Sequence, residues 1–188
     1  MAVREVLTYP HPLLKQVCTP AQPDEIEPVV TDLLDTMNSF DHCVGLAAPQ
    51  IGHTVRIAVV DITGHPRAKE PQGLMVLVNP RVTARSQGSK VSREGCLSLP
   101  DLTANVRRPR KATVAFGDQE VELAGFEARC VLHEIDHLDG ILFLDRVASI
   151  TDDLFRRQNY RCLLYTSPSP RDRTHHRVCR LLHDKVGG

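Results

Sequence analysis

The chain has 188 residues, a formal net charge of zero, and ordinary shares of apolar (41%) and charged (24%) residues. This length favours one globular domain with a hydrophobic core, and the balanced charge argues against a strong overall attraction to DNA or to an anionic membrane. Because the chain has no Trp and few aromatic residues, stacking platforms for single-stranded nucleic acid are not expected either.

The compartment is predicted from what the sequence lacks. The N-terminus has no charged, apolar and small-residue segments of the kind that make a secretory signal peptide, and no apolar run is long enough to span a bilayer. The six cysteines are therefore expected as thiols or metal ligands rather than as a disulfide framework. We expect a cytoplasmic protein.

Two helices are predicted, one early and one late. The first covers residues 25 to about 39, with Asp24 as its N-cap and apolar residues at helical spacing on one face. The second follows Gly125 and runs to about Asp139, where Gly140 suits the left-handed position after a helix.

Strands are predicted between these helices. Residues 56–61 and 75–79 are short runs rich in β-forming residues and bounded by Gly and Pro. Residues 111–116 and 119–123 flank Gly117-Asp118 and predict a hairpin. Strands enclosed by an early and a late helix indicate an α+β fold.

The last part of the chain differs in character. Residues 162–188 have neither helical nor strand periodicity and resemble a translated sequencing-library adapter, so we expect the native chain to end near Arg161. A natural basic tail is the alternative, since this segment holds five Arg or Lys against two Asp. The prediction is a single catalytic domain over residues 1–161 and a non-native or disordered tail over residues 162–188.

The strongest chemical signal is His133-Glu134-Ile135-Asp136-His137 in the late helix. Side chains four residues apart lie one above the other on a helix, so both imidazoles can reach one metal ion. Glu134 can stand beside a metal-bound water without binding the metal, which is where a general base is needed. A surface helix with scattered His and Glu is the competing interpretation.

Catalytic sites of this kind usually have a third protein ligand. A third His six residues after His137 is ruled out because position 143 is Phe, and no downstream Glu is suitably placed. Cys96, in Glu94-Gly-Cys-Leu-Ser98, is a plausible soft ligand. The alternative for Cys96 is a buried structural thiol.

A further segment, residues 43–52, reads Cys-Val-Gly-Leu-Ala-Ala-Pro-Gln-Ile-Gly. Its small residues would let the backbone approach a ligand closely, and the Gln50 amide can donate to a carbonyl oxygen. Close core packing would explain the same small residues.

Together these three segments resemble the peptide deformylase family. That family carries Gly-x-Gly-x-Ala-Ala-x-Gln, Glu-Gly-Cys-Leu-Ser and His-Glu-x-x-His in this order, and the similarity extends from about Tyr9 to Arg146. The resemblance implies short, mostly antiparallel strands around a central helix that bears the His-Glu-x-x-His motif, with a helix near the N-terminus. One departure is Cys43, which stands where the family has the first glycine of its first motif.

The resemblance implies that Cys96, His133 and His137 bind one divalent metal ion, typically Fe²⁺, with Zn²⁺, Ni²⁺ or Co²⁺ as alternatives. The implied reaction removes the N-formyl group from formyl-methionine at the start of new polypeptides. Glu134 would take a proton from water and pass it to the leaving amine. The Leu97 N–H and the Gln50 side chain would hold the developing oxyanion together with the metal.

Four residues are predicted to bind substrate. Phe126 and Cys130 share a helical face with the two histidines and would line a pocket for the methionine side chain, with Val44 opposite. Core packing is an equal alternative for these three residues. Gly45 would hydrogen-bond the peptide backbone in a manner like strand addition.

Other expectations concern supporting groups and partners. Arg108 is predicted either to pair with Asp136 behind the metal ligands or to be a solvated surface residue. Family members carry a C-terminal helix that docks on the ribosome, and residues 149–161 would begin such a helix, with Thr151 or Asp152 as its cap. The expected partners are N-formyl-methionyl nascent peptides and the ribosome.

Two rival functions remain open at this stage. A peptidase could use the same helix, but it would need a His or Glu as third ligand. A purely structural metal module would need four protein ligands, with Cys43 or Cys130 as the fourth.

Overall fold

The structure is a computed structural model that describes residues 3–157, which form one compact unit. The expected chain boundary near Arg161 and the tail over residues 162–188 lie outside the described residues, so both remain predictions.

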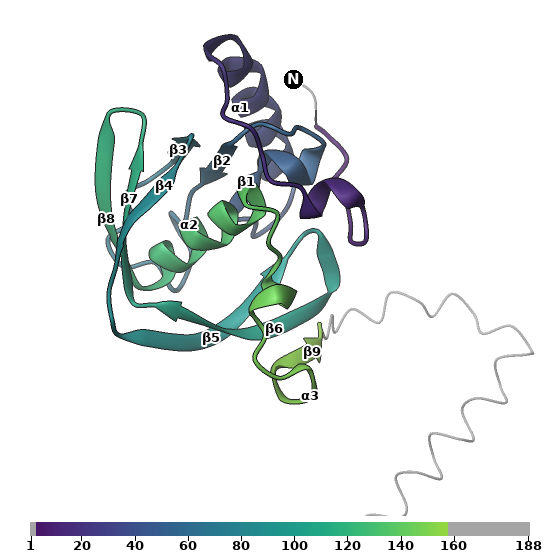
Figure 1. The fold of residues 1–188 in the computed structure, drawn as a ribbon, viewed down its shortest axis with the longest axis vertical. Helices are drawn as coiled ribbons and strands as arrows, with labels where there is room; N and C mark the ends of the chain where they lie inside the picture. Colours follow the sequence, from purple (N-terminus) through teal and green to yellow (C-terminus); the bar gives the residue numbers. More distant parts are fainter. Residues whose placement is uncertain (1–2, 158–188) are drawn as a thin grey trace, which may run out of the picture. The chain divides into compact units, whose positions relative to one another are not determined.

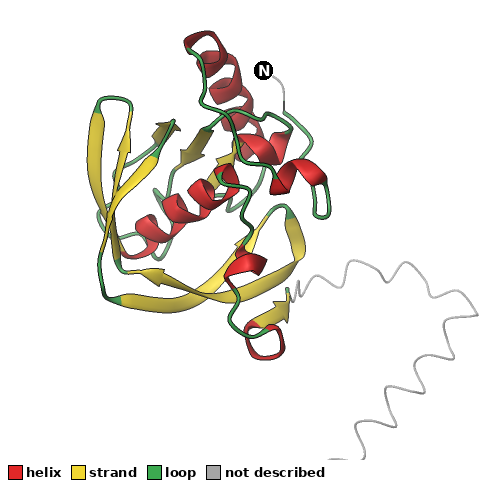
Figure 2. Ribbon diagram, in the orientation of Figure 1, coloured by secondary structure: helices red, strands yellow, loops and turns green. Residues whose placement is uncertain are grey.

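The described residues form three antiparallel sheets of three strands each (Figure 2). The first sheet has the order β1-β2-β3, the second β4-β7-β8 and the third β5-β6-β9. The strands are β1 (Gly45–Ala47), β2 (Ile57–Val60), β3 (Met75–Val78), β4 (Arg81–Arg85), β5 (Ser89–Cys96), β6 (Leu99–Pro109), β7 (Lys111–Phe116), β8 (Gln119–Ala124) and β9 (Leu154–Arg156).

One helix lies among these strands. Helix α2 (Gly125–Leu138) contacts strands of all three sheets and lies at the centre of the ribbon in Figure 1, with the β5–β6 and β7–β8 ribbons beside it. The other helical segments are α1 (Pro23–Asn38), α3 (Ile150–Asp153) and three short 3₁₀ turns, η1 (Pro12–Lys15), η2 (Ala48–Ile51) and η3 (Phe143–Arg146). The predicted α+β class, with a central motif-bearing helix, is confirmed.

The first sheet lies between the two long helices. Side chains alternate between the two faces of a strand, and in β2 the residues on both faces are buried. Ala58 and Val60 belong to the core cluster shared with α2, whereas Ile57 and Val59 belong to the cluster shared with α1. A strand that is buried on both faces explains why residues 57–60, at the centre of the predicted run 56–61, are all apolar.

Helix α1 begins earlier than predicted. Its first residue is Pro23 and its N-cap is Gln22, so the assignment of Asp24 as the cap is wrong. Proline suits the first helical position because it has no N–H to leave unpaired. The Glu25 side chain accepts a hydrogen bond from the Gln22 N–H at 2.8 Å, which satisfies a backbone donor at this end.

Helix α2 ends as predicted. Gly140 follows the C-cap Asp139 with φ of 68°, in the left-handed region that favours glycine. A Cβ at Gly140 would also lie only 2.7 Å from the Lys15 carbonyl oxygen, so the close approach of the N-terminal segment requires glycine as well.

Several strands were not predicted, namely β1, β4, β5, β6 and β9. The longest pair, β5 and β6, runs antiparallel and carries the Glu-Gly-Cys-Leu-Ser motif at its tip. The predicted helix over residues 149–161 is also wrong within the described part. The structure has a single helical turn there, α3, which is capped by Ser149. Residues 154–156 are strand β9 and pair with β6.

Among residues 3–157, no helix has the length and apolar character needed to cross a bilayer.

Candidate active site

Three elements bring the predicted site residues together. Helix α2 carries His133, Glu134 and His137, the end of β5 carries Cys96, and the short turn η2 carries Gln50. All five side chains are buried. They come from segments more than 35 residues apart in the chain, so only the folded sheets and helix make one site of them.

Cys96, His133 and His137 form a cluster that could hold a metal ion. One potential ligand atom from each residue lies within 4.8 Å of the other two, and Cys96 Sγ is 3.2 Å from His137 Nε2. Burial alone would raise the pKa of the Cys96 thiol, but the His137 imidazole and a hydrogen bond with His133 outweigh it and hold this pKa well below its usual range. A thiolate is therefore favoured, and thiolate is the form that binds a metal.

The orientation of the His133 ring also fits a ligand. Its Nδ1 lies 2.9 Å from Glu94 Oε2, so the carboxylate accepts the Nδ1 proton and the Nε2 lone pair is left for another partner. Among the described residues, Cys43 and Cys130 do not belong to the cluster, which has three members. A closed site with four protein ligands, as a structural metal module requires, is not supported by this arrangement.

Behind the cluster lies a buried network of charged side chains that centres on Glu94. Arg108 donates to both Glu94 oxygens, at 2.7 and 2.9 Å, and Arg129 donates to Oε1 at 2.6 Å. Arg108 also donates to Asp136 at 2.7 Å, so the predicted pairing of these two residues is confirmed. Although burial opposes it, hydrogen bonds from Arg108 and His133 hold the pKa of Glu94 far below its ordinary value.

The network was only partly anticipated from the sequence. Glu94 and Arg129 were not predicted as supporting residues, although Glu94 stands in the same motif as Cys96. Arg108 is 4% exposed, which rules out the alternative of a solvated surface arginine.

Glu134 lies beside the cluster with one oxygen unengaged. The residue is 5% exposed, and its buried Oε2 has no hydrogen-bond partner among the described residues. Burial, opposed by the imidazoles of His133 and His137, raises the pKa of Glu134 to about 7. A buried carboxylate oxygen is costly to leave unpaired, so a water or substrate group is the natural partner here.

Gln50 is fixed by three hydrogen bonds. Its Oε1 accepts from the Ala47 N–H at 2.9 Å, which directs the Nε2 group toward Ser98 Oγ at 3.1 Å and Cys96 Sγ at 3.4 Å. The amide donors therefore face the metal cluster. Leu97 lies between Cys96 and Ser98 in the turn that joins β5 to β6. Ser98, fully buried, is a site residue that sequence reasoning missed.

Comparison with known proteins agrees with this geometry. The model of the family described as polypeptide deformylase matches residues 3–153 of the chain. The chain belongs to the peptide deformylase family. It is 39% identical over 165 residues to the peptide deformylase of Rhizobium meliloti (strain 1021), covering 84% of this chain and 92% of that relative. It is 38% identical over 165 residues to the enzyme of Thermodesulfovibrio yellowstonii, covering 84% and 97%.

Solved deformylase structures share the fold. The peptide deformylase of Thermotoga maritima superposes with a TM-score of 0.70 at 28% identity, covering 79% of this chain and 100% of that one. A class I type b peptide deformylase from Acinetobacter baumannii, crystallised with Met-Ala-Ser bound, gives 0.71 at 31% identity, covering 78% and 100%. Deformylases are metal-dependent hydrolases that remove the N-formyl group of newly made polypeptides, and this is the activity of the family to which the chain belongs.

In this deformylase the residues predicted to bind the methionine side chain lie in or against the core. Cys130 is 7% exposed, and both Val44 and Phe126 pack against the same cluster. The Phe126 ring stacks on His65, with centroids 4.4 Å apart, and Arg67 lies 4.5 Å from the ring centroid. Packing accounts for these contacts, and a substrate pocket at Phe126, Cys130 and Val44 remains a prediction.

Cys43, the departure from the family pattern, is engaged with the backbone. Its thiol donates a hydrogen bond to the Gly45 carbonyl oxygen at 3.2 Å. Burial raises the pKa of Cys43 to about 12, although the hydrogen bond with Gly45 opposes this. A thiol that stays protonated is a poor nucleophile, so Cys43 is a packed hydrogen-bond donor in this deformylase.

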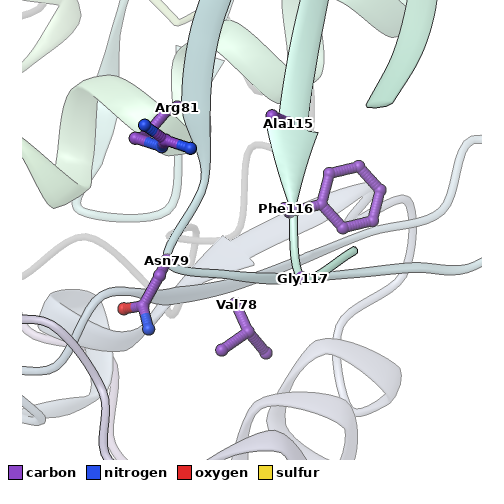
Figure 3. Close-up of a pocket in the computed structure, with 6 residues that line it drawn as sticks. All are labelled: Val78, Asn79, Arg81, Ala115, Phe116 and Gly117. Atoms are coloured by element: carbon purple, nitrogen blue, oxygen red, sulfur yellow. The ribbon is translucent and has the colours of Figure 1, made fainter. Parts of the chain in front are cut away.

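A cavity of about 270 Å³ lies elsewhere in the molecule (Figure 3). It is lined by Val78, Asn79, Arg81, Ala115, Phe116 and Gly117, none of which is a site residue. The Asn79 amide, its main uncharged polar group, already exchanges hydrogen bonds with the Ala21 backbone. Its lining provides no set of groups that could perform the deformylase reaction.

Proposed function

We propose that this deformylase removes the N-formyl group with Cys96, His133 and His137 as metal ligands and Glu134 as the proton-transfer residue. The observation that carries the proposal is the cluster itself, in which a Cys, rather than a third His or Glu, stands within 4.8 Å of both imidazoles. A thiolate as third ligand distinguishes this set from the ligand sets of His-Glu-x-x-His peptidases.

The donor set supports one divalent ion, and we propose Fe²⁺, with Zn²⁺, Ni²⁺ or Co²⁺ able to replace it. Thiolate and imidazole donors suit all of these metals. When bound, the ion supplies a Lewis acid that polarises a carbonyl and lowers the pKa of a water molecule.

Groups of the protein supply the proton transfer and the hydrogen bonds to the substrate. Glu134, with Oε2 unengaged and buried, accepts a proton from the attacking water and delivers it to the nitrogen of the leaving amine. The Gln50 Nε2 group and the Leu97 backbone N–H donate to the oxygen of the formyl group as negative charge develops there. Ala47 and Ser98 hold the Gln50 amide in place, and the N–H that is directed at Cys96 Sγ is the one that would donate to the formyl oxygen.

The proposed substrates are N-formyl-methionyl nascent peptides in the cytoplasm, with the ribosome as the particle that presents them. Support for a peptide ligand comes from the Acinetobacter baumannii relative, whose structure contains Met-Ala-Ser. We propose that the backbone of Gly45, at the start of strand β1, hydrogen-bonds such a peptide, and that Val44, Phe126 and Cys130 line its methionine pocket.

Metal removal tests this function. Protein loaded anaerobically with Fe²⁺ should release formate from formyl-Met-Ala, and chelated protein should release none until the metal is restored. Formate reports deformylation, and free alanine, measured in the same samples, reports cleavage of the Met-Ala bond. Cleavage of that bond without formate release would favour a peptidase, and equal activity in the chelated protein would contradict a metal-dependent reaction.

Replacing Gln50 with Ala should lower kcat by about 100-fold while changing KM little, because the lost hydrogen bond forms fully only in the transition state. Steady-state kinetics on formyl-Met-Ala measures both constants. The matched control is Gln87→Ala, since Gln87 is exposed in the loop before β5 and should show wild-type kinetics. A rise in KM with unchanged kcat would instead make Gln50 a ground-state binding residue.

A further inference from the structure

Gly45 faces Glu134 at an unusually short distance. A Cβ built on Gly45 would lie 2.6 Å from Glu134 Oε1, and 3.1 Å from both Cδ and Cγ of the same side chain. Its φ is not in the left-handed region, so the backbone conformation does not require glycine here. The requirement is spatial, because the end of the Glu134 side chain occupies the place where a methyl group would be.

The backbone at Gly45 has little freedom to move away. Gly45 pairs with Val60 in the first sheet, and the Asp61 N–H donates to the neighbouring Val44 carbonyl at 3.0 Å. The Cys43 thiol holds the Gly45 carbonyl oxygen at 3.2 Å. The next residue, Leu46, is fully buried. A side chain added at Gly45 would therefore displace Glu134 rather than the strand.

We propose that Gly45 is a positioning residue for Glu134: its bare Cα, held in place by strand β1 and the Cys43 thiol, determines where the Glu134 carboxylate lies relative to the metal ligands. This inference rests on the proposed role of Glu134. It adds a second role to Gly45, separate from any hydrogen bond between its backbone and the substrate. The backbone role survives substitution by Ala, whereas the spatial role does not.

The variant Gly45→Ala should lower kcat by about 10- to 100-fold, because a displacement of a reacting group by about 1 Å has effects of this size. KM and metal content should stay within about twofold of wild type. The absorption spectrum of the Co²⁺-substituted protein should also be unchanged, because the three atoms nearest to the new methyl group all belong to Glu134 and none to a ligand residue. Gly88→Ala is the matched control, since a Cβ there meets only Arg110 Cδ at 3.7 Å, and it should behave as wild type.

A double-mutant cycle with Glu134→Asp separates the two roles of Gly45. Asp is one methylene shorter, so the 2.6 Å contact with Oε1 is removed, and the nearest carboxyl carbon takes the place of Glu134 Cγ, 3.1 Å from the added methyl group. Gly45→Ala should then cost much less in kcat when introduced into the Glu134→Asp protein than it does in the wild-type background. An equal loss of kcat in both backgrounds would overturn the proposal, because the methyl group would then act on substrate or on the strand.

The remaining outcomes are also decisive. If Gly45→Ala alone is poorly folded, recovery of its thermal stability by Glu134→Asp would support the same steric contact, and no recovery would overturn it. Full activity of Glu134→Asp and Glu134→Ala would instead refute the proposed role of Glu134 itself, which is a failure of the proposed mechanism and can be distinguished from a failure at Gly45.

Discussion

Replacing Glu134 with Ala should leave the metal bound and slow deformylation by about 100- to 10,000-fold, the usual contribution of general acid–base catalysis. The carboxylate is not one of the three clustered ligand residues, and its Oε2 has no partner among the described residues. Its loss therefore removes a proton acceptor without removing a metal ligand. Metal analysis of the purified variant and kcat on formyl-Met-Ala measure the two effects separately.

The control for this variant is Glu122→Ala. Glu122 is a surface carboxylate on β8 that pairs with the exposed Lys111 at 2.8 Å, and exposed pairs of this kind contribute little to stability. Both its metal content and its kcat should match wild type. A Glu134→Ala protein with full activity would contradict the assigned proton transfer, and one that loses its metal would indicate that Glu134 supports the ligands instead.

How far the site could be predicted depended on how local each signal is. His133, Glu134 and His137 lie within one turn of a helix whose periodicity and terminal Gly140 are visible in the sequence. Cys96 is different, because nothing local distinguishes a ligand from a buried structural thiol. Its assignment required the family resemblance, and its place beside His137 depends on how the tip of the β5–β6 ribbon packs against α2.

The unpredicted strands have a physical reason in common. Strand β5 has a mixed polar sequence, with Lys90, Ser92 and Arg93 among its residues, and no apolar alternation marks it. It is a strand because it pairs along its length with β6. Likewise β9 forms by pairing with residues 102–104 of β6, where local signals favoured a longer helix. These segments are strands because they pair with a distant segment, and a local sequence pattern does not indicate such pairing.

The charged network escaped prediction for a similar reason. Arg108, Arg129 and Glu94 would each be expected at the surface on composition alone. They can be buried because the Glu94 carboxylate neutralises the charges of the two arginines. Arg108 and Arg129 lie 14 and 35 residues from Glu94 in the sequence, so a local pattern does not indicate that they pair with it. Only the position of Glu94, two residues before Cys96, could have suggested that it supports the metal ligands.

Replacing Glu94 with Ala should therefore lower both the stability of the protein and its affinity for metal. Removing one partner of a buried ion pair typically costs about 3–5 kcal/mol, since the remaining charge is left uncompensated. Here Arg129 would lose its carboxylate partner, and Arg108 would lose one of its two. The His133 Nδ1 would lose its acceptor as well, and loss of such a partner weakens metal affinity by about 10- to 100-fold.

Chemical denaturation of the apo-protein gives the stability change, and competition with a chelator gives the metal affinity. Glu94→Gln is the informative companion, because an amide keeps the shape and one acceptor oxygen but removes the charge. We expect it to lose less affinity than Glu94→Ala while still being destabilised, since Arg129 then lacks its carboxylate partner and Arg108 is left with Asp136. If Glu94→Ala lost stability but kept wild-type metal affinity, the network would hold β5 against α2 without orienting His133. Unchanged stability would contradict the buried network itself, because its arginines could then be hydrated without cost.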